Sequence, residues 1–154
     1  MSMLKRLADQ HPSSVAQLTL QYRMNEDICL LPNLLVYKGG LKCANNEVKS
    51  KKLSLPTFPR SLKNLIKSGN IGLGWLLPVV NPNKPVVFVN TDLIGQNLEF
   101  CGKGKGDVSR GLVNDTEVEI STFIVDGLLA CGLAPSAIGI ISPYRAQVRN
   151  GIRL

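Results

Sequence analysis

The sequence contains few side chains that bind metals. Its 154 residues include one histidine, His11, and four cysteines with no Cys-x-x-Cys pair, namely Cys29, Cys43, Cys101 and Cys131. Structural zinc sites and iron–sulfur clusters are held by closely spaced cysteine and histidine ligands, so the spacing predicts neither. We expect two or three of the cysteines to pack as small apolar side chains in a reducing compartment.

Three further features are missing. No apolar run is long enough to span a bilayer, and the N-terminus lacks an apolar core followed by a small-residue cleavage site, so we expect a soluble intracellular protein without a membrane partner. The segment Gly102–Gly106 (Gly-Lys-Gly-Lys-Gly) lacks the frame that ends in Gly-Lys-Ser/Thr between a strand and a helix. It predicts a flexible basic loop, not a nucleotide phosphate loop.

What is present is a globular composition with excess positive charge. Hydrophobic residues make up 44% and charged residues 19%, which predicts a folded chain of about one domain. The net charge of +7 favours an anionic partner such as nucleic acid or a nucleotide. Lys49, Lys51 and Lys52 lie close together; they suit a nucleic-acid backbone, but a solvated loop is the interpretation we favour.

The apolar pattern predicts an α/β protein with a parallel sheet flanked by helices. Residues 41–83 have poor periodicity and many prolines and glycines, so we interpret them as a variable insertion with at most one short helix, at 61–67. Elsewhere strands alternate with helices, which indicates a right-handed crossover. The expected elements are a helix at 3–8, a strand at 17–20, a helix that starts after Asn25, contains Pro32 and ends at Gly39-Gly40, a strand at 85–92, a helix from Asn114 to Gly132 with Glu117 completing a capping box, a strand at 137–141, and a helix start near 143.

The first candidate site follows the first expected strand. Gln21, Tyr22 and Arg23 place an amide, an aromatic ring and a guanidinium in succession. A ring can stack on a base, and arginine presents a planar fork of donors that matches phosphate. The alternative is that Tyr22 is a rim residue and Arg23 a solvated charge.

The second candidate site follows the strand expected at 137–141. Ser142, Tyr144 and Gln147 stand just past its carboxyl end, where open α/β sheets place ligands. A hydroxyl and the free amides of a helix start suit a backbone phosphate. The alternative is that Ser142 begins the helix and Tyr144 covers the sheet edge.

Both sites carry a resemblance to one family. Leu-Thr-Leu-Gln-Tyr-Arg-Met (18–24) with Asn-Glu-Asp-Ile after it, and Ile-Gly-Ile-Ile-Ser-Pro-Tyr-Arg-Ala-Gln (138–147), resemble motifs in the second RecA-like domain of superfamily 1B helicases. Asn114 and Glu117 match an Asn-x-x-Glu of that domain. The flanks at 3–7 and 34–41 resemble one branch, the eukaryotic replication ATP-dependent helicase/nucleases. The resemblance implies a partial, truncated RecA-like fold of the P-loop NTPase type over 1–154.

The resemblance also implies roles for the candidate residues. Arg23 would contact the γ-phosphate of ATP as the catalytic residue, Tyr22 would lie against adenine, and Gln21 would help to orient the site. Ser142, Tyr144 and Gln147 would hold the translocated strand. ATP and Mg²⁺ would be bound mainly by a first RecA-like domain, which this sequence lacks, and the iron–sulfur cluster of the family has no ligands here.

Large departures from the family pattern limit the expected activity. The sequence has no Walker A motif, no acidic Walker B strand and no nuclease carboxylates, so we expect an enzyme fragment that is inactive alone. Its expected partners are single-stranded or flap DNA, the remainder of the helicase/nuclease, and replication and repair proteins, in the nucleus or alternatively the mitochondrion. A superfamily 1B RNA helicase fragment and a non-catalytic single-strand-binding module are the alternatives.

Overall fold

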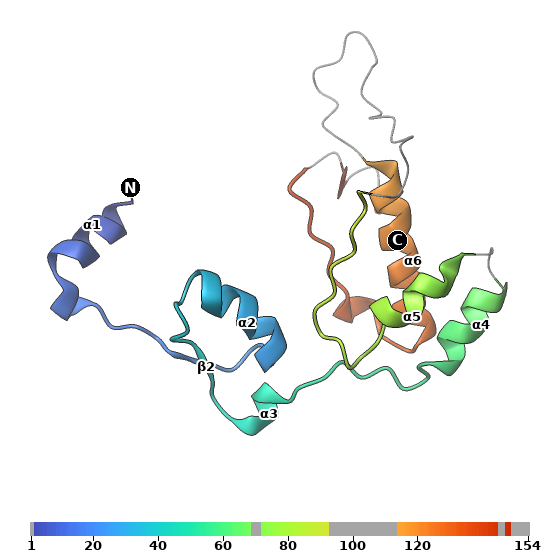
Figure 1. Ribbon diagram of the computed structural model, residues 1–154, viewed down its shortest axis with the longest axis horizontal. Coiled ribbons are helices and arrows are strands. Elements are labelled where there is room, and N and C mark those ends of the chain that lie inside the picture. The colour runs from blue at the N-terminus through green and yellow to red at the C-terminus, as the bar shows by residue number, and fades with distance from the viewer. Residues whose placement is uncertain (1, 69–71, 93–113, 145–146, 149–154) are drawn as a thin grey trace, which may run out of the picture. The chain divides into compact units, whose positions relative to one another are not determined.

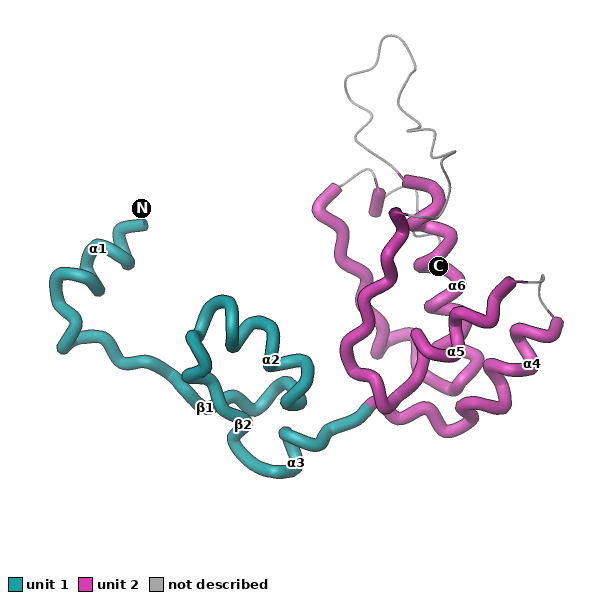
Figure 2. The backbone as a smooth tube through the Cα atoms, viewed as in Figure 1, with its two compact units in different colours: residues 1–52 teal, residues 53–154 magenta. Residues whose placement is uncertain are grey.

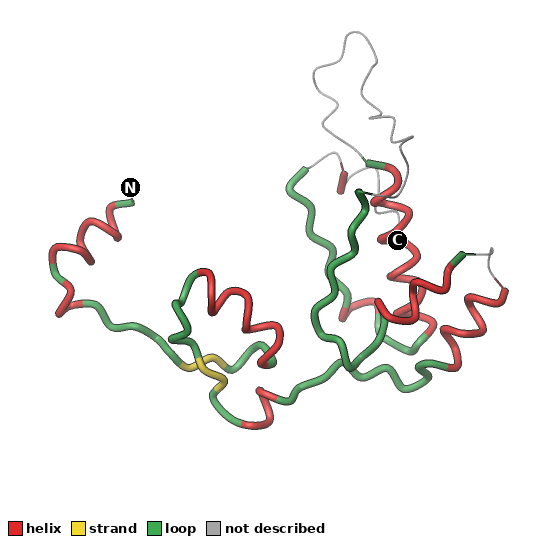
Figure 3. Tube along the Cα trace, viewed as in Figure 1, coloured by secondary structure: helices red, strands yellow, loops and turns green. Residues whose placement is uncertain are grey.

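The computed structural model describes residues 2–68, 72–92, 114–144 and 147–148. The chain divides into two compact units, residues 1–52 and 53–154 (Figure 2), and each is described by itself. Helices accompany a small parallel sheet (Figures 1 and 3). The expected α/β class is therefore confirmed. The glycine-rich loop at 102–106 and Cys101 lie outside the described residues.

The first unit begins with the expected amphipathic helix. Ser2 caps it, because its Oγ accepts a hydrogen bond from the Lys5 N–H (3.3 Å). The strand that follows is shorter and later than the predicted 17–20. The elements of this unit are α1 (Met3–Gln10), η1 (Pro12–Ser14), β1 (Leu20–Gln21), α2 (Glu26–Leu35), β2 (Lys42–Cys43) and α3 (Asn46–Lys49).

Helix α2 starts where the sequence predicts. Asn25 Oδ1 accepts the Ile28 N–H (2.9 Å) and so satisfies one of the free amides of the first turn. Pro32 lies inside the helix without delaying its start, although it supplies no N–H to the helix. The helix ends at Leu35, before the predicted Gly39-Gly40.

The side chain of Asn33 ties α2 to the segment that leads into β2. Its Nδ2 donates to the Leu41 carbonyl (2.9 Å), and its Oδ1 accepts the Leu41 N–H (2.8 Å). Strand β2 then pairs with β1 in parallel, with Leu20 opposite Lys42 and Gln21 opposite Cys43. The sheet thus joins residues about twenty positions apart, next to the first candidate site.

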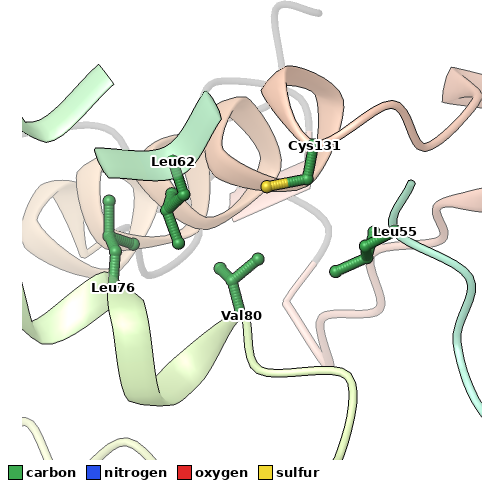
Figure 4. Packing of buried hydrophobic residues seen from close by; sticks show 5 residues of the cluster. All are labelled: Leu55, Leu62, Leu76, Val80 and Cys131. Atoms are coloured by element: carbon green, nitrogen blue, oxygen red, sulfur yellow. The ribbon is translucent and has the colours of Figure 1, made fainter. Parts of the chain in front are cut away.

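The second unit consists of helices around an apolar core. Leu55, Leu62, Leu76, Val80 and Cys131 point toward one another in Figure 4. The first four lie in 41–83. The helix predicted there at 61–67 forms as Arg60–Ser68, but the prediction of at most one helix is wrong, because the short segments Asn46–Lys49, Leu73–Trp75 and Leu76–Val79 are also helical and too short to show an apolar period. The elements of this unit are α4 (Arg60–Ser68), η2 (Leu73–Trp75), α5 (Leu76–Val79), α6 (Asp115–Ala130) and η3 (Pro135–Ala137).

Both ends of α6 follow from local sequence. Asn114 Oδ1 accepts the Glu117 N–H (3.1 Å), which confirms the predicted cap. At the other end Gly132 has φ +90°, which disfavours residues with a side chain. Its N–H donates to the Leu129 carbonyl (2.9 Å), and the Leu133 N–H donates to the Leu128 carbonyl (3.1 Å), so the helix ends in a Schellman motif.

The strands predicted at 85–92 and 137–141 do not form among the described residues. Residues 86–91 and 138–142 have no assigned strand, and Pro135–Ala137 is a 3-10 helix (Figure 3). An apolar run becomes a strand only when a neighbouring strand supplies its hydrogen bonds. In the described parts of the second unit no such neighbour pairs with either run, so the predicted crossover is not formed there and Phe88 and Ile141 are exposed.

Candidate functional site

Gln21 closes the turn that carries the first candidate site. Its side-chain Oε1 accepts the N–H groups of Arg23 (2.9 Å) and Met24 (2.7 Å), and its Nε2 donates to the Met24 carbonyl (2.6 Å). Gln21 is 9% exposed. Its amide therefore holds the backbone of the turn from the buried side.

Cys43 completes the hydrogen bonding of this amide. Gln21 Nε2 also donates to Cys43 Sγ (3.0 Å), and the thiol donates weakly to the Met24 carbonyl (3.7 Å). The backbone ladder holds Cys43 there, because the Ala44 N–H donates to the Gln21 carbonyl (2.9 Å). Sequence reasoning missed Cys43, since no local signal links it to a residue 22 positions earlier.

Tyr22 and Arg23 project from the turn into solvent. Tyr22 is 71% exposed, and Arg23 is also exposed. Within the described residues no carboxylate pairs with Arg23. The turn thus presents an aromatic ring and a guanidinium at adjacent positions, on a backbone held by hydrogen bonds. The ring can stack on a base, and the guanidinium can bind phosphate.

Asn25 anchors the far end of the same loop. It is 7% exposed, and besides capping α2 it donates from Nδ2 to the Lys51 carbonyl (3.1 Å). The turn from Gln21 to Asn25 is therefore held at both ends by buried side-chain amides. The cap could be read from the sequence, but the contact with Lys51 could not.

Ser142 and Tyr144 meet at the second candidate site. The Tyr144 N–H donates to Ser142 Oγ (3.2 Å), and the Val148 N–H donates to the Tyr144 carbonyl (3.4 Å), one helical turn later. Ser142 thus caps this turn, as the structural alternative supposed. The Tyr144 ring is 51% exposed and accessible to a ligand.

Gln147 binds the start of α6. Its Oε1 accepts the Asn114 N–H (2.7 Å), and its Nε2 donates to the Asn114 carbonyl (3.2 Å). The predicted capping box would have the Glu117 side chain accept the Asn114 N–H. In the structure the Gln147 side chain accepts it instead. The side chain therefore joins two segments 33 residues apart, while Gln21, Tyr22 and Arg23 form a separate cluster in the other unit.

The described cysteines are free thiols. Burial raises the pKa of the Cys29 thiol, and its neighbour Cys43 raises that pKa further. Burial likewise raises the pKa of the Cys131 thiol, against a smaller opposing effect of a hydrogen bond with the Leu62 backbone. Cys29 and Cys131 pack as apolar residues, as expected, and both stay protonated at neutral pH.

Neither a metal centre nor a membrane span is found in the part of the chain that the structure describes. No group of three or more His, Cys, Asp or Glu side chains there is arranged to hold a metal ion. No helix there has the length and apolar character needed to cross a membrane.

Comparison with known proteins supplies the family. A family model described as an AAA domain matches residues 1–151. The chain is 38% identical over 148 residues to the DNA replication ATP-dependent helicase/nuclease DNA2 of Saccharomyces cerevisiae, covering 96% of this chain and 9% of that protein. It is 38% identical over 149 residues to the protein of the same name from Homo sapiens, covering 96% and 13%. The chain thus spans about a tenth of the length of these relatives. It belongs to the AAA domain family, and over nearly its whole length it is similar to a segment of the eukaryotic DNA replication ATP-dependent helicase/nucleases.

Proposed function

We propose that this chain supplies part of the ATP-hydrolysis interface and part of the DNA track of an ATP-driven replication helicase/nuclease. The observation that carries the proposal is the turn closed by Gln21, which presents Tyr22 and Arg23 to solvent with no carboxylate on Arg23 among the described residues. The similarity to relatives named as ATP-dependent helicase/nucleases supports it. Residues 1–154 would belong to a second RecA-like domain, in which 41–83 is the variable part, and would act in the nucleus.

At the nucleotide, Arg23 would bind the γ-phosphate and Tyr22 would lie against the adenine ring. A guanidinium stabilises the negative charge that spreads over the transferred phosphoryl group. ATP brings Mg²⁺, which neutralises part of this charge. Because the phosphate loop and the metal ligands would come from another domain, we propose that this chain alone does not hydrolyse ATP.

At the DNA, Ser142, Tyr144 and Gln147 would contact the single strand. Tyr144 is exposed and can stack on a base. The Ser142 hydroxyl, which accepts the Tyr144 N–H, is itself a donor that suits a backbone phosphate. Gln147 would contribute mainly by holding the start of α6, since both of its polar atoms already bind Asn114.

A pair of substitutions tests the two halves of this proposal in a helicase/nuclease polypeptide that carries the segment. Arg23→Ala should lower ATP turnover by at least about a hundredfold, because such an arginine contributes roughly 10³ to 10⁵ in rate, and should leave DNA binding within about twofold. Ser142→Ala should weaken single-strand binding, measured by fluorescence anisotropy over a salt series, with a smaller effect on turnover at saturating DNA.

Arg6→Ala is the matched control, since Arg6 is an exposed arginine on α1 outside both sites. It should change neither quantity by more than about twofold, which is less than 0.5 kcal/mol. If Arg23→Ala behaves like Arg6→Ala, the assignment of Arg23 to phosphate is wrong. Unchanged isotherms for Ser142→Ala would remove that residue from the DNA track.

A further inference from the structure

We propose that Cys43 is a positioning residue for nucleotide hydrolysis, which acts on Arg23 through the side chain of Gln21. This inference rests on the proposed function of Arg23. The thiol lies behind the turn and touches two of its members, the Gln21 amide and the Met24 carbonyl. Among the described residues no hydrogen bond joins the thiol to Tyr22 or Arg23, so its proposed effect on them is indirect.

The hydrogen-bond inventory of the Gln21 amide shows what the thiol contributes. The amide nitrogen has two N–H groups, and it donates to the Met24 carbonyl (2.6 Å) and to Cys43 Sγ (3.0 Å). The amide oxygen accepts the two backbone N–H groups of Arg23 and Met24. With Cys43 in place, every donor and acceptor direction of this buried amide is used, and its plane is fixed.

Backbone pairing of the two strands fixes the position of the Cys43 thiol relative to Gln21. Cys43 stands directly opposite Gln21 in the parallel pair of β1 and β2, and residues opposite each other in a sheet project to the same face. The residue before Cys43 is also held by the sheet, because the Lys42 N–H donates to the Thr19 carbonyl (2.7 Å). The clamp of Asn33 on Leu41 sets the approach of β2.

Loss of the thiol should therefore loosen the amide and with it the turn. A buried N–H left without a partner carries a free-energy penalty, which favours rotation of the amide away from its present plane, and such a rotation would weaken the bond from the Arg23 N–H to Gln21 Oε1. The guanidinium would sample more positions relative to the phosphate. Transition-state contacts tolerate little displacement, so turnover falls even though nucleotide binding changes less.

Cys29 offers a matched control within the same unit. It is buried at 4% exposure and lines, together with Cys43, a cavity of about 310 Å³. Among the described residues no hydrogen bond joins Cys29 to Gln21. Removal of its thiol thus alters the packing near Cys43 without removing the contact on which the inference depends.

The test measures ATP turnover against ATP concentration in the polypeptide used for the Arg23 experiment. Cys43→Val, which removes the hydrogen bond at similar size, should lower kcat about tenfold and leave KM within about twofold, the size expected for one lost partner of a buried amide. Cys43→Ser, which restores a donor and acceptor, should return kcat to within about threefold of the parent. Cys29→Ala should change kcat by less than about twofold.

Two further outcomes separate this inference from its alternatives. In a Gln21→Ala background Cys43→Val should add little further loss; a full additional tenfold loss would show that the thiol acts independently of Gln21 and would overturn the inference. If Arg23→Ala abolishes turnover while Cys43→Val leaves kcat unchanged, the inference falls and the proposed function stands. If Arg23→Ala itself has no effect, the proposed function has failed, and this positioning role fails with it.

Discussion

The two units bury different kinds of side chain. In the first unit the buried residues are the polar Gln21 and Asn25 and the thiol-bearing Cys29, whereas the second unit fully buries Leu62 and Leu76. Directional hydrogen bonds define the first unit, and apolar packing defines the second. Polar contacts, and not a hydrophobic core, therefore determine the shape of the candidate phosphate-binding loop.

The free energies of the two kinds of contact differ accordingly. A buried leucine contributes about 1.5 to 3 kcal/mol, while a net hydrogen bond contributes about 0.5 to 1.5 kcal/mol. We therefore expect the second unit to have the larger free energy of unfolding. The first unit holds its side chains in place with hydrogen bonds that each contribute little free energy. The first unit also leaves large apolar side chains exposed, among them Leu18, Leu20, Leu30, Leu31, Leu34, Leu35 and Val36.

The largest effect should come from the apolar core. Leu62→Ala removes a fully buried side chain and should lower the free energy of unfolding by about 2 to 5 kcal/mol. Trp75, the single tryptophan of the sequence, packs against this core, so its fluorescence during urea denaturation reports on the second unit. Leu35→Ala, at a 74% exposed position of the first unit, should shift this transition by less than about 0.5 kcal/mol. Equal shifts would refute the contrast between the units.

A smaller and local effect should follow loss of a buried amide in the first unit. Asn25→Ala removes the α2 cap and the bond to the Lys51 carbonyl, at a cost of about 1 kcal/mol for the cap alone. Amide hydrogen exchange at Ile28 should become about fivefold faster, with the Trp75 transition unchanged. Asn45→Ala, which removes an exposed cap of the short helix α3, should leave exchange at Ile28 as it is. A large shift of the Trp75 transition in Asn25→Ala would show that the units are coupled.

The smallest effect is a pH dependence in the second unit. Burial raises the pKa of the Cys131 thiol above its ordinary value of 9.0. Above about pH 9 the unfolded chain therefore releases this proton while the folded chain still holds it, so the thiol stabilises the fold below that pH and progressively less above it. The difference in unfolding free energy between the parent and Cys131→Ala should shrink from pH 8 to pH 10 in urea denaturation. A difference that is constant or grows would contradict the burial of this thiol.

Sequence reasoning succeeded where a contact spans one helical turn. The caps of α2 and α6 at Asn25 and Asn114, and the end of α6 at Gly132, follow from bonds between residues no more than about five apart. Tyr22 and Arg23 were named as candidates from their chemical types and the family resemblance, and their roles stay predictions. In 41–83 the helix predicted at 61–67 forms as α4, whereas α3, η2 and α5 were missed because segments of three or four residues are too short to show a repeating apolar pattern.

The sequence was therefore sufficient to predict the α/β class, the starts of α2 and α6, the C-terminal end of α6 and the chemical groups of both candidate sites. Tertiary structure alone decided that Cys43 lies behind Gln21 and that Gln147, not Glu117, binds the Asn114 N–H. It also decided that the apolar runs near Phe88 and Ile141 remain outside a sheet in the described residues. The two groups of contacts differ in the separation of their partners along the chain. Caps and turns are satisfied by near neighbours, whereas strand pairing and bonds between distant side chains depend on which segments the whole fold brings together.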